Sequence, residues 1–411
     1  MIEYAPSLTF GPGFSDAQRR LDAAQLRQER AERMRAVMRA HQVPALLASG
    51  AAAGRYLTGL TGAEFASQLW YVLFFAESDP VVFAHAGYIT RGAQEAPWVK
   101  DWRLARAWLG GIAGPEATRV EAKLFAKDLQ AVLHERGLAQ EPLAVSGFDN
   151  AALNALQEAG LQTVGGRDLL LEAASIKTPE EIRCITLAVT VAETAWPPFM
   201  QALRGGGPEQ AAVLAGMQRL AALGAEPRMG IRSGPLTFER GQKETQRIVR
   251  PGELLYGQLC GTSFLGYRVC LYRTFVVGRE PSPVERDLYQ RLYDRLHAAI
   301  AELRPGQTTA DAARHFPPAS TWGYRDEAEV LTIEIGHGVG LNQYEPPVIN
   351  RQWSLPYPQP LLENMVVAME GREGSPQVGG VRLERMVWIS AQGPRLLDRF
   401  PAEAIQTIPL F

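Results

Sequence analysis

One histidine and two glutamates in the last third of this 411-residue chain are the residues most suited to chemistry. His337 stands in the glycine-rich segment Gly336–Leu341, whereas Glu370 and Glu384 stand in apolar stretches that favour β-strands. Buried carboxylates near each other repel, so one must hold a proton or a cation must lie between them. Such an anionic pocket beside an imidazole indicates proton-transfer chemistry.

The composition indicates an ordinary soluble globular protein. Hydrophobic residues make up 46% and charged residues 21%, and the formal net charge of −2 gives no indication of a nucleic-acid partner. The sequence shows neither a signal-peptide pattern nor an apolar run of roughly 18 residues, and its 3 cysteines are too few for a disulfide framework. We therefore expect a cytoplasmic protein with a small-molecule substrate, no nucleic acid and no membrane partner.

The pattern of elements predicts a smaller domain over residues 1–170 and a larger one over residues 171–411. In the first, helical composition alternates with short apolar runs, which is typical of an α/β layer. Thr178–Glu181 predicts the start of a long helix through about Arg204, because Thr suits an N-cap, Pro the first helical position and acids the first turn. Strands are expected at 44–48, 68–76, 80–84, 143–146, 245–249, 254–260 and 267–277, and further helices at 16–42, 118–138, 150–160, 209–223, 282–304 and 309–316.

Three segments, taken in order, carry a family resemblance. They are Ser175–Ile182, Gly266–Gly278 with its Gly-Tyr and Arg-Thr-Phe elements, and Gly336–Pro347. Together they resemble motifs of the creatinase/aminopeptidase P/prolidase family. The resemblance implies an α+β pita-bread domain preceded by a smaller α/β domain. It also implies a homodimer, in which the partner's N-terminal domain lies near each active site.

Metallopeptidases of that family hold two divalent cations with two Asp, one His and two Glu, because paired cations that activate water need this much negative charge. By position, the resemblance assigns the last three ligands to His337, Glu370 and Glu384. The positions of the two Asp fall on Leu259 and Cys270, which cannot replace them as carboxylates. We therefore expect no metal or other cofactor, and no Xaa-Pro peptidase activity.

Two alternatives for a metal site remain open. A one-residue bulge could turn Gln258 toward the site, since bulges re-aim side chains. A single ion could also be held by a four-residue set whose thiolate and imidazole would favour zinc or iron. That set is Cys270, His337, Glu370 and Glu384. Against it, a cysteine such as Cys270 is often only a small buried hydrophobe.

Two further departures from the family concern proton donors. Its second histidine is replaced here by Tyr344, a phenol that can donate a hydrogen bond but carries a proton less readily at neutral pH. The loop that often carries another histidine contains none in this chain. Its charged residues Glu239, Arg240 and Lys243 are expected to form a solvated loop, and the alternative is that they line the site entrance.

Creatinase, a member that lacks both aspartates and works without metal, gives the leading hypothesis. Its acids hold a guanidinium-bearing substrate, so Glu370 and Glu384 are expected to bind a small nitrogenous cation through bidentate hydrogen bonds. His337 would then be the acid/base group, and Tyr344 would polarise the substrate. The expected reaction is hydrolysis of a non-peptide C–N bond.

The remaining pocket residues follow from the same resemblance. The arginines that bind the substrate carboxylate in creatinase fall on Leu69 and Pro347, so the ligand is expected to be less anionic or held otherwise. Phe65, Trp70 and Tyr272 are candidate aromatic walls. The expected substrate-binding residues are Glu370, Glu384, Cys270, Tyr272 and Trp70.

Two other readings of the function remain open. An enzyme of the same fold could act as a lyase, decarboxylase or cyclase in a specialised pathway, since one group of the family cleaves a sulfonium substrate by elimination. The chain could instead be a catalytically inactive binding module, as histone-chaperone subunits with this fold are. The retained histidine and two glutamates favour a working pocket.

Overall fold

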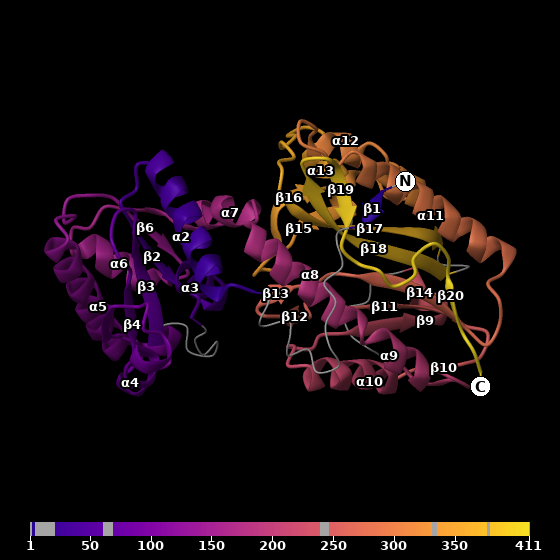
Figure 1. Ribbon diagram of the computed structural model, residues 1–411, viewed down its shortest axis with the longest axis horizontal. Helices are drawn as coiled ribbons and strands as arrows, with labels where there is room; N and C mark the ends of the chain where they lie inside the picture. The colour runs from indigo at the N-terminus through magenta and orange to yellow at the C-terminus, as the bar shows by residue number, and fades with distance from the viewer. Residues whose placement is uncertain are drawn as a thin grey trace. The chain divides into compact units, whose positions relative to one another are not determined.

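The computed structural model describes residues 2–4, 21–60, 69–238, 246–330, 335–375 and 379–410. They form an N-terminal unit of residues 23–174 and a C-terminal unit of residues 1–22 with 175–411. The first strand, β1 (Glu3–Tyr4), belongs to the C-terminal unit because it pairs in parallel with β19 (Gly393–Leu396; Figure 1). This grouping differs from the expected first domain, which included these residues. Within the described ranges, no helix is long and apolar enough to cross a membrane.

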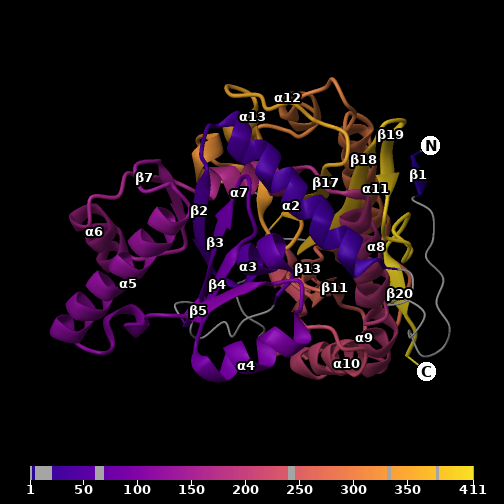
Figure 2. The same cartoon turned by 60° about the vertical axis from the view of Figure 1, so that its left-hand side comes forward.

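The N-terminal unit is a six-stranded sheet in the order β5-β4-β3-β2-β6-β7, with helices on both faces (Figure 2). Side chains such as Tyr71, Leu73 and Phe83 project from one face and pack with Phe125 of α5. The other face carries Trp70, whose ring lies against Gly54 of α3. The strands are β2 (Ala45–Ser49), β3 (Trp70–Phe75), β4 (Val81–Ala84), β5 (Asp101–Leu104), β6 (Leu143–Ser146) and β7 (Thr163–Gly165). The helices are α2 (Ala23–Ala40), α3 (Ala51–Thr58), α4 (Ala86–Glu95), α5 (Pro115–Glu135), α6 (Asn150–Glu158) and α7 (Arg167–Ser175).

The C-terminal unit contains two larger sheets that face each other, with helices on their outer sides (Figure 1). One has the order β1-β19-β18-β17-β15-β16 and is covered by α11; the other has the order β20-β14-β11-β9 and is covered by α9 and α10. The first sheet contains β15 (Gly336–Gly338), β16 (Glu345–Ile349), β17 (Val366–Ser375) and β18 (Gly379–Ser390). The second contains β9 (Gly230–Ser233), β11 (Leu254–Gln258), β14 (Tyr272–Val277) and β20 (Gln406–Ile408). The helices are α10 (Glu209–Ala222), α11 (Pro283–Ala301) and α12 (Thr309–Ala313).

The helix expected to run through about Arg204 is interrupted. It is α8 (Pro179–Glu193) followed by α9 (Trp196–Ala202). Pro197 and Pro198 explain the break, because proline has no N–H for the preceding turn and is tolerated in the first turn of a new helix. The new start brings Trp196 against Phe275 of β14, with ring centroids 5.6 Å apart.

Buried polar contacts join the three sequence motifs. The Lys177 ammonium forms an ion pair with Glu345, and both side chains are 1% exposed. The other oxygen of Glu345 accepts the backbone N–H of Asn342, which fixes the turn after the glycine-rich segment. Glu181, part of the capping box of α8, accepts a hydrogen bond from the Tyr267 hydroxyl at 3.0 Å. The first motif, Ser175–Ile182, therefore anchors the other two.

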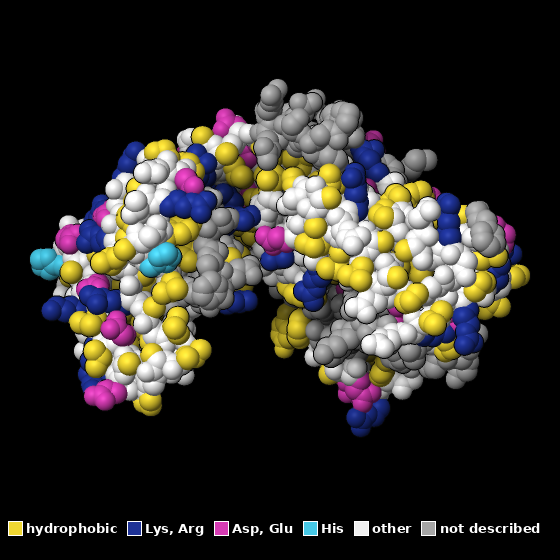
Figure 3. Space-filling model, turned by 90° about the horizontal axis from the view of Figure 1, so that it is seen from below, with side chains coloured by type: hydrophobic (Ala, Val, Ile, Leu, Met, Phe, Trp, Pro, Cys, Tyr) yellow, Lys and Arg dark blue, Asp and Glu magenta, His cyan; other side chains and the backbone are white. Residues whose placement is uncertain are grey.

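The distribution of charged side chains on the surface is consistent with the small net charge of −2. On the face shown in Figure 3, acidic and basic side chains are interspersed and no large patch of one sign is visible. The described residues on this face therefore form no extended basic surface of the kind that binds nucleic-acid backbones.

Lys177→Met should lower the free energy of unfolding by about 3–5 kcal/mol, because it leaves the Glu345 carboxylate buried without its cation. The measurement is urea denaturation followed by tryptophan fluorescence. Arg291→Ala is the control, since it breaks an exposed pair with Asp287 on α11 and should cost less than about 1 kcal/mol. Equal losses for the two variants would contradict a structural role for the buried pair.

Candidate active site

His337 lies on β15, where close backbone approach explains the glycines around it. A Cβ atom at position 338 would lie 2.2 Å from the carbonyl oxygen of Pro346, and one at position 340 would lie 2.3 Å from a Glu345 carboxylate oxygen. The imidazole is fully buried, and its Nδ1 lies 3.1 Å from the Gly338 carbonyl oxygen. A proton on Nδ1 satisfies that carbonyl and directs Nε2 toward Glu384, 4.0 Å from Oε1.

Glu370 and Glu384 face each other across the β17–β18 ladder, at directly paired positions. Glu370 is 1% exposed and Glu384 is fully buried. Like charges at directly opposite positions are destabilising, and burial adds a desolvation cost. Burial therefore raises the pKa of the Glu384 carboxyl well above its ordinary value, and Cys260 and Glu370 raise it further. No described residue donates a hydrogen bond to Oε1 of Glu384.

Cys260 is a site residue that the sequence analysis missed. Its thiol donates a hydrogen bond to Oε2 of Glu384 at 3.2 Å. The assignment by motif spacing had pointed to Leu259, with Gln258 as the alternative. The ladder explains the difference, because the Leu259 N–H bonds to the Leu271 carbonyl and so sets Cys260 opposite Cys270. The two-residue periodicity of β11, followed two residues beyond its end at Gln258, would have found Cys260.

Cys270, by contrast, lies where the resemblance assigned it. Burial raises the pKa of its thiol well above the usual range, and a hydrogen bond with Cys260 adds to the shift. The Nε2 atom of Gln343 lies 3.9 Å from the Cys270 sulfur. These contacts favour a neutral thiol that does not act as a nucleophile.

The Arg-Thr-Phe motif holds the backbone at Glu384 and at Arg382, two residues before it. The Arg273 guanidinium donates to the Glu384 carbonyl at 2.8 Å and to the Asp398 carboxylate at 2.6 Å. Thr274 exchanges two hydrogen bonds with the backbone of Arg382, at 2.7 and 2.9 Å. Glu384 is therefore fixed from β14 as well as from its own sheet, which explains the motif in structural terms.

A buried arginine beside the glutamates is the second residue that sequence reasoning missed. Arg382 Nη1 lies 3.9 Å from Oε2 of Glu370. Its guanidinium lies over the rings of Tyr256 and Tyr272, at 5.3 and 5.5 Å from their centroids. Tyr272 thus contacts Arg382, which in turn favours an ionised Glu370.

Tyr344 lies at the edge of the site. Its ring meets the His337 ring edge-on with centroids 4.5 Å apart, and its side chain is partly open to solvent at 42% exposure. The phenol oxygen accepts a long hydrogen bond from Gln343 at 3.5 Å. A group that is both exposed and in contact with His337 is suitably placed to meet a substrate; its predicted polarising role stays a prediction.

The other predicted pocket residues lie elsewhere or outside the described ranges. Trp70 is a buried core residue of the N-terminal unit, and its role in substrate binding stays a prediction. Gln258 ends β11 and is partly exposed. The residues outside the described ranges are Phe65, Glu239, Arg240 and Lys243.

The donor set does not fit the family's pair of hard divalent cations, because no carboxylate stands at the two aspartate positions. It does fit one thiophilic ion. The ligand atoms of Cys260, Cys270 and Glu384 lie within 4.8 Å of one another, and so do those of His337, Glu370 and Glu384. The two groups share Glu384, and the two sulfurs of the first group suit zinc, so the structure widens the single-ion alternative to include Cys260.

Glu384→Gln should become progressively more stable relative to wild type between pH 5 and 8 in chelator-treated protein. The raised pKa means that the folded state binds more protons than the unfolded state above about pH 4.3, so wild type loses up to about 1.4 kcal/mol per pH unit there. Urea denaturation at several pH values measures this difference.

Asp101→Asn is the control for that series. Hydrogen bonds from the Arg103 guanidinium hold the pKa of Asp101 below its ordinary value. Its stabilising effect is complete above the unfolded pKa of about 3.9, so the loss in this variant should be constant from pH 5 to 8. A pH-independent difference for Glu384→Gln would show that this carboxyl is ionised throughout.

Comparisons with known proteins agree with this architecture. The sequence matches Metallopeptidase family M24 over residues 187–391. An Xaa-Pro dipeptidase of Pyrococcus furiosus is 30% identical over 247 residues, which cover 58% of this chain and 67% of that protein. A dimethylsulfoniopropionate lyase of Roseovarius nubinhibens is 26% identical over 303 residues, which cover 69% of this chain and 65% of that protein. The crystal structure of a dipeptidase from Mycobacterium ulcerans matches with a TM-score of 0.73 at 22% identity, over 95% of this chain and 100% of that one.

The alignments thus span about two thirds of the curated relatives' length. The structural match confirms the expected fold class, an α+β pita-bread domain preceded by a smaller α/β domain. The chain belongs to metallopeptidase family M24, the creatinase/aminopeptidase P/prolidase family, whose members include hydrolases.

Proposed function

We propose that this protein is a hydrolase that cleaves a non-peptide C–N bond in a small, cationic, nitrogen-containing substrate. The observation that carries the proposal is the buried pair Glu370 and Glu384, set opposite each other with His337 Nε2 4.0 Å from the second carboxylate. A guanidinium, amidinium or ammonium group between these carboxylates offsets their repulsion and can donate bidentate hydrogen bonds. This chemistry needs no metal.

The proposed reaction uses His337 as both base and acid. Nε2 takes a proton from water as the oxygen adds to the substrate carbon, and the imidazolium then protonates the leaving nitrogen as the C–N bond breaks. The Gly338 carbonyl holds Nδ1–H and keeps the ring in the required tautomer. Arg382 keeps Glu370 anionic, whereas Glu384 releases its proton when the substrate cation binds.

A second candidate is hydrolysis with one thiophilic metal ion. It is favoured by the group of Cys260, Cys270 and Glu384, which shares Glu384 with the group of His337, Glu370 and Glu384. Such an ion supplies a Lewis acid and an activated water. Because the chain is similar to proteins named Xaa-Pro dipeptidases, the bonds cleaved under this second candidate include peptide C–N bonds. The chain is also similar to a lyase, which makes elimination the alternative reaction. Analysis of the reaction products distinguishes elimination from hydrolysis.

Cationic guanidino, amidino or ammonium metabolites should raise the melting temperature of wild type but not of Glu370→Gln, because that variant loses one of the two anions. Thermal-shift screening measures this. Glu373→Gln is the matched control, since Glu373 lies on the same strand but on the opposite face, paired with Arg295. Equal shifts in all three proteins, or no shift by any such cation in wild type, would contradict the proposal.

Protein purified from rich medium should contain far less than one zinc, iron or manganese per chain. Elemental analysis measures this, with Cys270→Ala as the comparison. A stoichiometric ion that the variant loses would instead establish the second candidate, because the thiols of Cys260 and Cys270 are the soft ligands of the cluster.

A further inference from the structure

Two of the three cysteines of the chain, Cys260 and Cys270, lie in contact with each other beside Glu384. Their thiols are hydrogen-bonded to each other. The two sulfurs and a carboxylate oxygen of Glu384 all lie within 4.8 Å of one another. Cys260 is 8% exposed and Cys270 is 2% exposed. Whether the two sulfurs can form a bond then depends on the backbone that carries them.

The backbone ladder places the two cysteines at the spacing that a disulfide requires. The residue pair on either side of them is joined by a backbone hydrogen bond: Leu259 with Leu271, and Gly261 with Val269. The cysteines between them therefore form a non-hydrogen-bonded pair, in which opposite Cα atoms lie about 4.5 Å apart. Disulfides accept Cα separations of about 4.4–6.8 Å. Cys260 and Cys270 can therefore be bridged without movement of the strands.

A small oxidant can approach the pair from the side of Tyr344, which is 42% exposed. Gln343 connects this residue to the thiols, because its Nε2 lies 3.5 Å from the Tyr344 hydroxyl and 3.9 Å from the Cys270 sulfur. A substrate that reaches Glu384 also passes the Cys260 thiol, which is hydrogen-bonded to that carboxylate. Hydrogen peroxide is smaller than such a substrate and can take the same approach.

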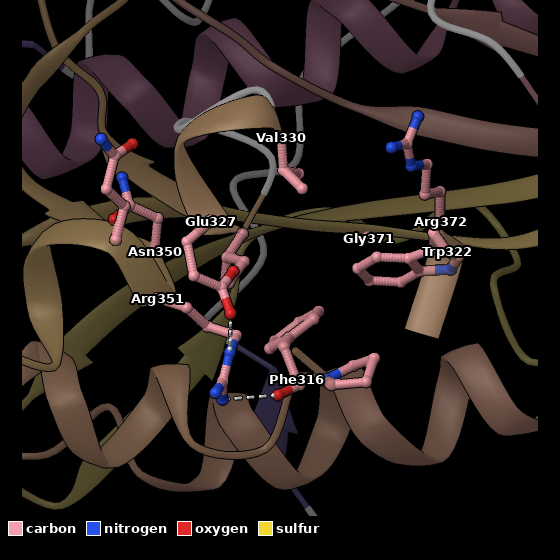
Figure 4. A pocket seen from close by; sticks show the side chains of 11 residues that line it. Phe316, Trp322, Glu327, Val330, Asn350, Arg351, Gly371 and Arg372 are labelled. Atoms are coloured by element: carbon pink, nitrogen blue, oxygen red, sulfur yellow. Dashed lines mark hydrogen bonds and ion pairs between the residues drawn. The ribbon is translucent and has the colours of Figure 1, made fainter. Parts of the chain in front are cut away.

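The cavity shown in Figure 4 is not part of this approach. It has a volume of about 40 Å³, and the 11 residues that line it include Phe316, Trp322 and Gly371 but neither cysteine. Its charged residues Glu327 and Arg351 form an ion pair at 2.9 Å. The cavity therefore holds no thiol that could compete for the oxidant.

We propose that Cys260 and Cys270 are a site of reversible oxidation, at which hydrogen peroxide forms a disulfide across the ladder. The sulfur of Cys260, the more exposed of the two, attacks one peroxide oxygen. The O–O bond breaks, and the leaving hydroxide takes the thiol proton, which gives a sulfenic acid and water. The Cys270 sulfur then attacks the Cys260 sulfur, the S–O bond breaks, and the hydroxide leaves as water with the Cys270 proton.

The two steps balance, because two thiols are oxidised to one disulfide and one peroxide is reduced to two waters. Contact between the sulfurs offsets the low reactivity of a buried neutral thiol, since the second step occurs within one molecule. A thiol reductant reverses the reaction by thiol–disulfide exchange.

The disulfide also changes the surroundings of Glu384. The reduced Cys260 thiol donates a hydrogen bond to Oε2 of Glu384 at 3.2 Å, whereas a disulfide sulfur carries no hydrogen to donate. Hydrogen bonds to an ionised group are roughly twice as strong as those between neutral groups, so the loss of this donor weakens the pair of Glu384 with a bound cation. This consequence rests on the proposed function, whereas formation of the disulfide does not.

The first test counts thiols by mass spectrometry. Full-length protein is reduced with dithiothreitol, freed of reductant, treated with hydrogen peroxide, denatured and alkylated with iodoacetamide. One of the three thiols should then be alkylated, and dithiothreitol should restore all three. Trypsin cleaves after Arg268, between the two cysteines, so a linked pair of peptides identifies the bond. Three alkylated thiols, or added oxygen atoms without linked peptides, would overturn the proposal.

Cys184→Ser is the matched control, because Cys184 is also buried but lies on α8. This variant should form the linked peptides as wild type does and leave no thiol to alkylate. Cys260→Ser and Cys270→Ser should form no linked peptides. Linked peptides that contain Cys184 would show that the pair is wrongly assigned. Wild type and Cys184→Ser decide the question even if a variant of the pair fails to fold.

The second test is isothermal titration of both forms with methylguanidinium chloride. Oxidised wild type should bind the cation about 10-fold more weakly than reduced wild type, the range for a lost hydrogen bond to a charged group. In Cys260→Ser, peroxide treatment should leave the affinity unchanged.

The outcomes separate the disulfide from the proposed function. Equal affinities of the two forms would overturn the effect on Glu384, while the disulfide and the proposed function stand. If neither methylguanidinium nor any cation of the thermal-shift screen binds the reduced protein, the proposed function and the effect on Glu384 fail together. The linked peptides then support or overturn the disulfide by themselves.

Discussion

The repulsion between two carboxylates fixed opposite each other in a buried ladder is the constraint on which the rest of the C-terminal unit depends. Neither Glu370 nor Glu384 can move away, because strand register sets their positions. The surrounding residues therefore have to offset the negative charge of the two carboxylates. Arg382 lies 3.9 Å from Glu370, and the Cys260 thiol donates a hydrogen bond to Glu384.

The buried residues behind the two glutamates restrict their movement. Arg273 and Arg385 share the Asp398 carboxylate, and Arg273 also holds the backbone of Glu384. Replacing such a buried ion cluster by apolar side chains is often neutral for stability, so its value lies in orientation. A site whose acids are held from two sheets can keep a fixed distance between them while substrates enter and leave.

The sequence predicted most of the fold because its signals were local or repeated in known motifs. Thr178 and Ser282 cap helices as expected, and the buried Lys177–Glu345 pair shows why distant motifs occur together. The missed site residues depended on pairing between strands. Motif spacing selected Leu259, whereas the β11–β14 register sets Cys260 opposite Cys270. Arg382 could be identified as a site residue only from the structure, which places it beside Glu370 and over two tyrosine rings.

The pairing of β1 with β19 makes the C-terminal unit discontinuous in sequence, with the N-terminal unit inserted into it. A truncated chain that starts at Ser175 would lack β1 and leave β19 as an open edge. Unpaired edge strands are templates for association between molecules. The two residues of β1 thus replace the longer β19 as the edge of the sheet that carries His337, Glu370 and Glu384.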